Sequence, residues 1–192
     1  MRTIRHSYIE YAVRDGLGYA WTFLKGCGNG PDICKVRSTS AGCWAEKMAH
    51  RLHKSFKPHF DWQMFTRPFP RKPSIILVCF TGEIAFASYL QLLIAKERIL
   101  QHPEHIFLLL TKRPEIYHYY LAWPTNTWLG VSLTGAETPD RQQTVMYTLL
   151  MANGGHKWLS YEPMLGPLAV SLEGIEWLVC GPQTGVRTGA PW

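Results

Sequence analysis

The chain has 192 residues, of which 46% are hydrophobic, and a formal net charge of +6 at pH 7. This length predicts a single domain over residues 1–192, because it can bury one sizeable core but is short for two. No apolar run reaches the roughly 18 residues of a membrane-spanning helix, and the Arg/His-rich start lacks the apolar stretch of a secretory signal. We therefore expect a cytoplasmic protein without a membrane segment.

Three of the five cysteines, Cys27, Cys34 and Cys43, lie close together near the amino terminus. Without secretory features, clustered thiols bind metal more often than they form disulfides. Glycines at positions 26, 28, 30 and 42 allow the loop of residues 26–43 to fold closely around a compact ligand. Three thiolates can hold three irons of a [4Fe–4S] cluster and leave the fourth iron open to another ligand.

The cysteine spacing alone does not identify the metal. Six residues and then eight separate the three thiols, which matches neither a zinc ribbon nor the compact spacing of radical enzymes. The alternatives are a zinc site with a fourth ligand such as His50 or His53, or three cysteines that bind nothing. Cys79 and Cys180 fall in predicted strands, where we expect small buried side chains.

A helix is expected to begin at or just after Cys43. Its apolar and basic residues each recur at helical spacing, on two different faces: Trp44, Met48 and Leu52, and Lys47, Arg51 and Lys54. From Lys47 to Lys72 the chain carries seven Lys or Arg residues against one acid, which suggests a polyanionic partner. The proline-rich part, Lys57–Pro73, is predicted to be a loop.

From residue 74 onward, short apolar runs alternate with helix-like stretches, as in βα units that form a parallel sheet. The predicted strands are Ser74–Phe80, His105–Thr111, Thr127–Leu133, Lys157–Glu162 and Ile175–Gly181. Their nearly continuous hydrophobicity suits strands covered on both faces, so we expect an α/β fold with a partial (β/α) barrel. The sequence stops soon after the last strand without a covering helix. Either the barrel is open at this edge, or the chain is a fragment truncated at its C-terminus.

Three helices are expected between these strands. Ala85–Leu100 is long and apolar, and Arg113–Leu121 is a shorter candidate whose first turn is set by Pro114. The third begins at Thr138-Pro139-Asp140, which supplies an N-cap, a proline at the first helical position and an acid in the first turn.

Polar residues follow each predicted strand, at the end where a parallel barrel places its ligand site. In chain order they are Thr81, Gly82 and Glu83, then Thr111, Lys112 and Arg113, then Ser132, then Ser160 and Glu162, and finally Gln183. A carboxylate such as Glu83 suits an ammonium group, and Lys112 and Arg113 suit a carboxylate or phosphate. Ser160 and Glu162 alternate along their strand and are expected to face the barrel interior, where a charged side chain needs a partner or a task. Ordinary turns with solvated side chains are the competing interpretation.

Several motifs occur in a fixed order: Gly26-Cys27, Cys43-Trp44-Ala45-Glu46, Phe80-Thr81-Gly82-Glu83, Leu110-Thr111-Lys112-Arg113-Pro114, Trp128-Leu129-Gly130-Val131-Ser132, Ser160-Tyr161-Glu162-Pro163 and Trp177-Leu178-Val179-Cys180-Gly181. This series resembles the successive motifs of the phage Gp37/Gp68 family, which is similar to radical S-adenosylmethionine (SAM) enzymes. That family often has its last two cysteines closer together, in Cys-x-x-Cys-Tyr-Ala-Glu. Here Cys34 lies nine positions before Cys43, and Trp44 replaces the tyrosine.

The resemblance implies a partial (β/α) barrel of the radical SAM type with a [4Fe–4S] cluster on Cys27, Cys34 and Cys43. It also implies SAM at the strand ends and an external electron donor. Thr81-Gly82-Glu83 resembles the Gly-Gly-Glu motif that holds the SAM amino group in such enzymes.

Two functions remain open from the sequence. The first is a radical SAM-type enzyme that acts on an unknown substrate. The second is a metal-stabilised nucleic-acid-binding protein without catalysis, with Arg51, Lys54 and Lys57 as phosphate contacts among interleaved aromatic residues. A solvated helix face followed by a partly buried loop explains that basic stretch equally well.

Overall fold

The structure is a computed structural model that describes residues 5–6, 18–119 and 122–182. The strands are β1 (Arg5–His6), β2 (Gly18–Trp21), β3 (Leu24–Lys25), β4 (His59–Phe60), β5 (Ile75–Val78), β6 (Ile106–Thr111), β7 (Trp123–Leu133), β8 (Gly154–Tyr161) and β9 (Trp177–Cys180). The α-helices are α2 (Trp44–Arg51), α3 (Trp62–Phe65), α4 (Tyr89–Leu100) and α5 (Pro139–Leu150). Short 3-10 helices are η1 (Lys35–Ser38), η2 (Ile84–Phe86) and η3 (Pro114–Tyr119).

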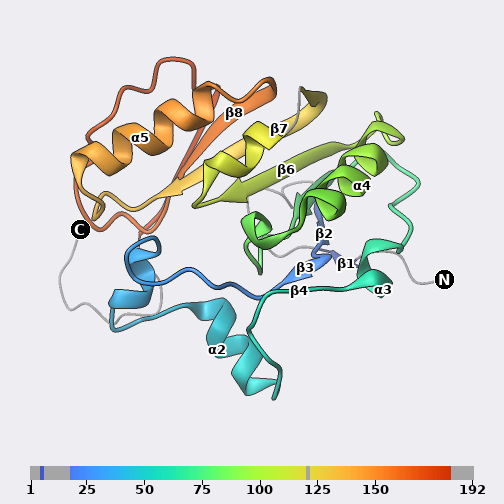
Figure 1. The fold of residues 1–192 in the computed structure, drawn as a ribbon, viewed down its shortest axis with the longest axis horizontal. Coiled ribbons are helices and arrows are strands. Elements are labelled where there is room, and N and C mark those ends of the chain that lie inside the picture. The colour runs from blue at the N-terminus through green and yellow to red at the C-terminus, as the bar shows by residue number, and fades with distance from the viewer. Residues whose placement is uncertain (1–4, 7–17, 120–121, 183–192) are drawn as a thin grey trace.

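One seven-stranded sheet organises the chain, in the order β1-β2-β5-β6-β7-β8-β9. The six strands from β2 to β9 pair in parallel, and β1 is antiparallel at one edge. The parallel strands curl into a half-barrel, and α4 and α5 lie on one face of it (Figure 1). This arrangement confirms the predicted α/β fold and partial (β/α) barrel.

The main core fills the space between the sheet and its helices. From α4 and α5, residues such as Leu92, Ile99 and Leu149 pack against sheet residues that include Phe107 and Leu129, all nearly inaccessible to solvent. Burial of this apolar surface is the largest stabilising contribution to the fold.

Aromatic rings dominate the opposite, concave face of the sheet. Trp158 is fully buried there and stacks on Trp177 with ring centroids 5.0 Å apart. Gly130 on the neighbouring strand leaves the space that this ring needs, because a Cβ at position 130 would lie 2.2 Å from the Trp158 indole.

The five predicted strands are all present, with boundaries that differ by a few residues. The predicted helix Ala85–Leu100 is divided into η2 and α4, because the Ser88 hydroxyl caps a new helix by accepting from the Gln91 N–H. The predicted helix Arg113–Leu121 is instead the 3-10 helix η3. The remaining two helix starts are confirmed: Thr138 caps α5, and Cys43 is the N-cap residue of α2.

The prediction of a continuous loop over Lys57–Pro73 is wrong. This segment contains β4, which pairs with β3, and α3, whose first turn is capped by the Asp61 carboxylate. Aromatic packing explains why this segment is structured, because Phe65 and Phe69 pack around the buried Trp21 ring. Within the described residues, no helix is both long and apolar enough to cross a bilayer.

Candidate functional site at the carboxyl ends of the strands

Glu83 is the centre of a buried polar network at the carboxyl ends of β5 and β6. Its side chain is almost inaccessible, and each of its two carboxylate oxygens accepts two hydrogen bonds. Oε2 accepts from Asn29 Nδ2 at 2.9 Å and from the Lys112 backbone N–H at 3.1 Å. Oε1 accepts from the Thr111 hydroxyl and from the Ala85 N–H. The carboxylate is therefore fully satisfied by protein donors, as a buried charge requires.

The network continues across the strand ends to β7 and β8. Lys112 Nζ donates to the Ser132 hydroxyl at 2.6 Å, and Ser132 pairs in register with Ser160 on β8. Arg141 on α5 approaches from the helix side and donates to the Lys112 carbonyl at 3.4 Å. The structure thus brings together the predicted residues Glu83, Lys112, Ser132 and Ser160, together with Thr111 and Arg113.

Asn29 joins this network to the cysteine loop. It is 1% exposed, and all its polar groups are engaged. Besides the bond to Glu83, its Oδ1 accepts from Arg113 Nε at 2.6 Å, and its backbone carbonyl accepts from Arg37 Nη1 at 2.7 Å. Its own backbone N–H donates to Cys27 Sγ at 3.4 Å. The sequence does not mark this residue as functional, because an Asn among glycines is a common turn former and its partners lie far along the chain.

Arg37 links the three cysteine-bearing segments through one guanidinium group. Nη1 contacts Asn29, two residues after Cys27, and Nη2 forms an ion pair with Glu46 Oε1 at 2.8 Å, three residues after Cys43. Arg37 itself follows Cys34 by three residues. The three thiols are therefore carried by segments that converge on one side chain, which sequence spacing alone did not reveal.

The thiols are screened from water to different extents. Cys34 is buried, whereas Cys27 and Cys43 are partly buried. Burial raises the pKa of the Cys27 thiol to about 11, and the negative charge of Glu83 acts in the same direction.

A backbone contact anchors the cysteine loop to the sheet. Gly26 bridges to Gly82 just after β5, and the Gly26 carbonyl accepts from the Glu83 N–H at 3.0 Å. Gly26 has φ +78°, and a Cβ there would lie 2.5 Å from the Phe56 carbonyl oxygen. Only glycine combines this backbone conformation with so close an approach.

The donor set of this loop fits a thiolate-bound metal ion or iron–sulfur cluster. Three thiols, an N–H directed at sulfur and a nearby Arg are the groups that hold and tune such clusters. Among the described residues, only His102, Glu104 and His105 bring three ligand atoms within 4.8 Å of one another. The three sulfurs do not form so compact a group.

Other predicted site residues lie apart from this network. Thr81 is exposed. Gly82 contributes through its backbone bridge, and Gln183 lies outside the described residues. Glu162 was expected inside the barrel but is exposed, because β8 ends at Tyr161 and the Glu162 side chain lies over Gly181 at the rim.

The two remaining cysteines differ from each other. Cys79 is fully buried, as predicted, and its sulfur accepts a hydrogen bond from the Leu24 N–H at 3.4 Å. The predicted burial is wrong for Cys180, which is exposed on β9, the edge strand of the described sheet.

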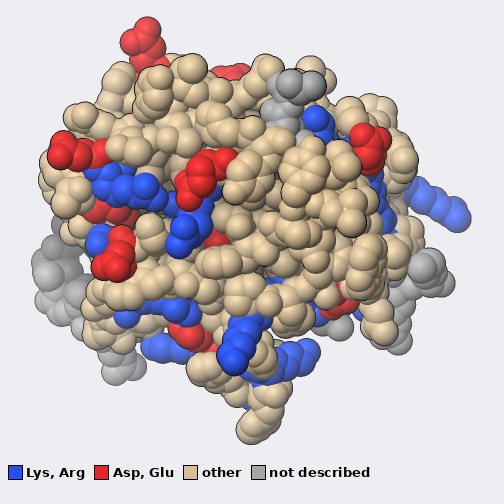
Figure 2. All heavy atoms as spheres, viewed as in Figure 1, with Lys and Arg blue, Asp and Glu red and all other residues tan. Residues whose placement is uncertain are grey.

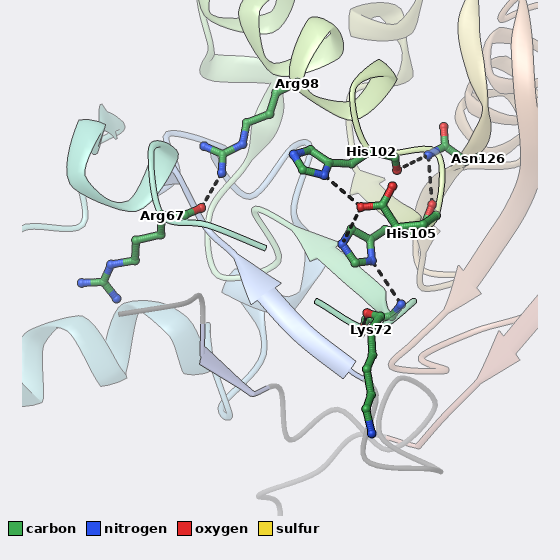
Figure 3. Close-up of polar contacts among 8 residues, drawn as sticks. Arg67, Lys72, Arg98, His102, His105 and Asn126 are labelled. Atoms are coloured by element: carbon green, nitrogen blue, oxygen red, sulfur yellow. Dashed lines mark hydrogen bonds and ion pairs between the residues drawn. The ribbon is translucent and has the colours of Figure 1, made fainter. Parts of the chain in front are cut away.

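The compact group at His102, Glu104 and His105 lies at the amino ends of the strands (Figure 3). His105 Nδ1 accepts from the Ser74 N–H at 3.2 Å, so the neutral ring carries its proton on Nε2. Nε2 lies 3.5 Å from Glu104 Oε1 and is the ring atom that would have to bind a metal. A protonated nitrogen has no free lone pair, so we interpret this group as a structural brace.

Comparison with known proteins identifies the family. A protein-family model described as "Protein of unknown function (DUF5131)" matches residues 7–190. No curated protein and no solved structure matches the chain. The match extends over nearly all of the sequence, including the cysteine loop and every described parallel strand, and the chain therefore belongs to the DUF5131 family.

Proposed function

We propose that this protein is a radical SAM-type enzyme in which Cys27, Cys34 and Cys43 hold one [4Fe–4S] cluster. The observation that carries the proposal is the Arg37 side chain, which ties together the three cysteine-bearing segments. Asn29 then ties the same loop to the strand ends, where a parallel barrel binds its ligands. When bound, the cluster would supply the electron that cleaves SAM and starts radical chemistry on a substrate, with an external electron donor.

The strand-end cations and hydroxyls are assigned to SAM. Lys112 and Arg113 suit its carboxylate, because each retains N–H donors beyond those already used. Ser132 and Ser160 are buried neighbours on the same face, and their hydroxyls can donate to or accept from polar groups of the ligand. Thr81 and Glu162 are assigned to the rim of this site and to substrate contact.

Glu83 receives a different role from the one its motif suggests. All four acceptor positions of its carboxylate are occupied by protein donors, so an ammonium group would have to displace one of them. We assign Glu83 and Thr111 as positioning residues that hold Asn29 against β6. The backbone at Thr81 and Gly82 is left to accept from the SAM amino group.

The test is anaerobic purification followed by reconstitution with iron and sulfide. The wild-type protein should carry about four irons, and SAM should change the spectrum of the reduced cluster. Each of the single substitutions Cys27→Ser, Cys34→Ser and Cys43→Ser should abolish the cluster. Cys180→Ser is the matched control and should retain full iron content, because this thiol is exposed and lies on β9.

Two outcomes would contradict the assignment. Stoichiometric zinc without iron, together with no SAM effect, would favour the metal-stabilised binding protein. Full iron content in Cys34→Ser would show that another residue completes the site.

A further inference from the structure

Helix α2 exposes an apolar stripe. None of its residues is buried, and it projects from the body of the molecule at the lower end of the view (Figure 1). Trp44, Met48 and Leu52 lie at helical spacing along this stripe and are 59%, 44% and 54% exposed. Trp62, at the start of α3, is also 59% exposed. Large exposed side chains that recur along one helix mark an interaction surface more often than a solvated face.

Basic residues run beside this stripe without acidic partners. Lys47, Arg51 and Lys54 each lie three or two positions after a stripe residue and therefore form an adjacent row on the helix and its C-terminal extension. These three and Lys57 are exposed, and none of them forms an ion pair within the described part of the chain.

Nearby acids do not neutralise this charge. Glu46 pairs with Arg37, and Asp61 pairs with Lys25, so both carboxylates are already compensated. Lys and Arg residues accordingly gather at the end of the molecule where α2 lies (Figure 2).

Both ends of the basic segment are attached to the cysteine loop. Cys43 is the N-cap residue of α2, and the Cys27 N–H donates to the Phe56 carbonyl at 3.0 Å. The segment from Trp44 to Lys57 therefore begins and ends beside the proposed cluster ligands. A ligand held on it would lie next to the site of the proposed chemistry.

We propose that α2 and the residues up to Trp62 bind a single-stranded nucleic acid, which is the substrate of the site. Lys47, Arg51, Lys54 and Lys57 contact phosphates, and the exposed Trp44 and Trp62 rings stack on bases. A single strand fits better than a duplex, because ring stacking and access to a base both require an unstacked base. The assignment as substrate depends on the proposed function, whereas binding does not.

Fluorescence anisotropy of the full chain tests binding, with labelled single-stranded DNA and RNA of about 20 nucleotides and the corresponding duplexes. The double variant Arg51→Gln/Lys54→Gln should weaken single-strand binding at least about tenfold. It should also reduce the slope of log K against log[salt] by about 0.7 for each phosphate that the variant no longer neutralises. Arg71→Gln/Lys72→Gln is the matched control, because it removes the same charge from exposed residues just before β5 and should change neither quantity.

Trp44→Ala should weaken binding at least about fivefold and leave the salt slope unchanged, because it removes stacking and no charge. Equal effects of the two double variants, or duplex binding as tight as single-strand binding, would overturn the proposal. So would a dimer in sedimentation that Trp44→Ala dissociates while oligonucleotide affinity is unaltered, since the stripe would then be a protein interface. Iron content measured on the same samples keeps the two proposals separate: a wild-type protein that carries a full cluster but does not bind single-stranded nucleic acid refutes only this one.

Discussion

Two buried polar networks lie at opposite ends of the same sheet. At the amino ends, His105 accepts from the Ser74 N–H, and Asn126 donates to the His102 and His105 carbonyls. Those contacts hold neighbouring connections of the sheet together. At the carboxyl ends, Glu83 and Asn29 instead connect the sheet to a cysteine loop that lies 54 residues away in sequence from Glu83. The strands of the seven-stranded sheet pair with one another without a strand from that loop.

The comparison indicates how a structural network differs from one that supports a site. Both networks satisfy buried polar groups, and both should therefore contribute to stability. Of the two networks, only the one at the carboxyl ends contacts a thiol, that of Cys27, and contains a lysine, Lys112, with N–H donors that are not yet used. Changes at the two ends should thus have similar effects on unfolding but different effects on iron binding.

The largest expected effect is that of Glu83→Ala. It leaves four donors without their acceptor in a buried place, and we expect the free energy of unfolding to fall by about 3–5 kcal/mol. Urea denaturation measures the change. Glu173→Ala removes an exposed carboxylate between β8 and β9 and should cost less than about 0.5 kcal/mol. If the free energy of unfolding falls by less than about 1 kcal/mol in Glu83→Ala, the Glu83 network does not stabilise the carboxyl ends of the strands.

Asn29→Ala should affect iron retention more strongly than the free energy of unfolding. We expect a loss of about 2 kcal/mol, because the buried amide bonds to Glu83 and Arg113 are removed. We also expect reconstituted protein to lose most of its iron on desalting, since the loop would no longer be held against β6. Iron per chain after gel filtration is the measurement. If Asn29→Ala retains all of its iron, the cysteine loop holds the metal without the strand-end network.

Most of the sheet was predictable from the sequence, because its evidence is local. Runs such as Ile75–Val78 and Ile106–Thr111 are apolar throughout, and such runs are typical of parallel strands covered on both faces. The short strand β2, Gly18–Trp21, was not predicted. Its four residues include a glycine and show no clear pattern, and parallel pairing with β5, more than fifty residues later, makes it a strand.

The site was predictable only in part, for a related reason. Parallel strands place their carboxyl ends together, so the residues after each strand pointed to Glu83, Lys112 and Ser132. Asn29 and Arg37 carry no such positional signal. Asn29 meets Arg113 across 84 residues, and that contact exists only once the sheet has formed.

A smaller effect is expected at the amino ends, from His105→Leu. The Ser74 N–H would lose its acceptor while the apolar surroundings of Phe69 and Phe107 would accept the new side chain. We expect a loss of about 1–2 kcal/mol in urea denaturation. Iron content should equal that of the wild type, in contrast to Asn29→Ala. A His105→Leu protein that fails to retain iron would contradict the functional difference between the two ends.

The smallest effect is a pH dependence that arises at the same histidine. Burial lowers the pKa of His105 below its usual value of 6.5, although the neighbouring Glu104 carboxylate opposes this shift. The unfolded chain therefore binds a proton at this ring more readily than the folded chain does. Stability from His105 is present above the unfolded pKa and declines as the pH falls below it.

Between pH 7.5 and pH 5.5, the free energy of unfolding should fall with a slope below the one-proton limit of about 1.4 kcal/mol per pH unit. His105→Leu should show a shallower decline over this window, because its side chain cannot take up a proton. Urea denaturation at several pH values measures both slopes, and identical slopes for His105→Leu and wild type would show that the amino-end network does not titrate. Because no thiol takes part, the experiment works equally well on protein without a cluster and tests the brace independently of the proposed chemistry.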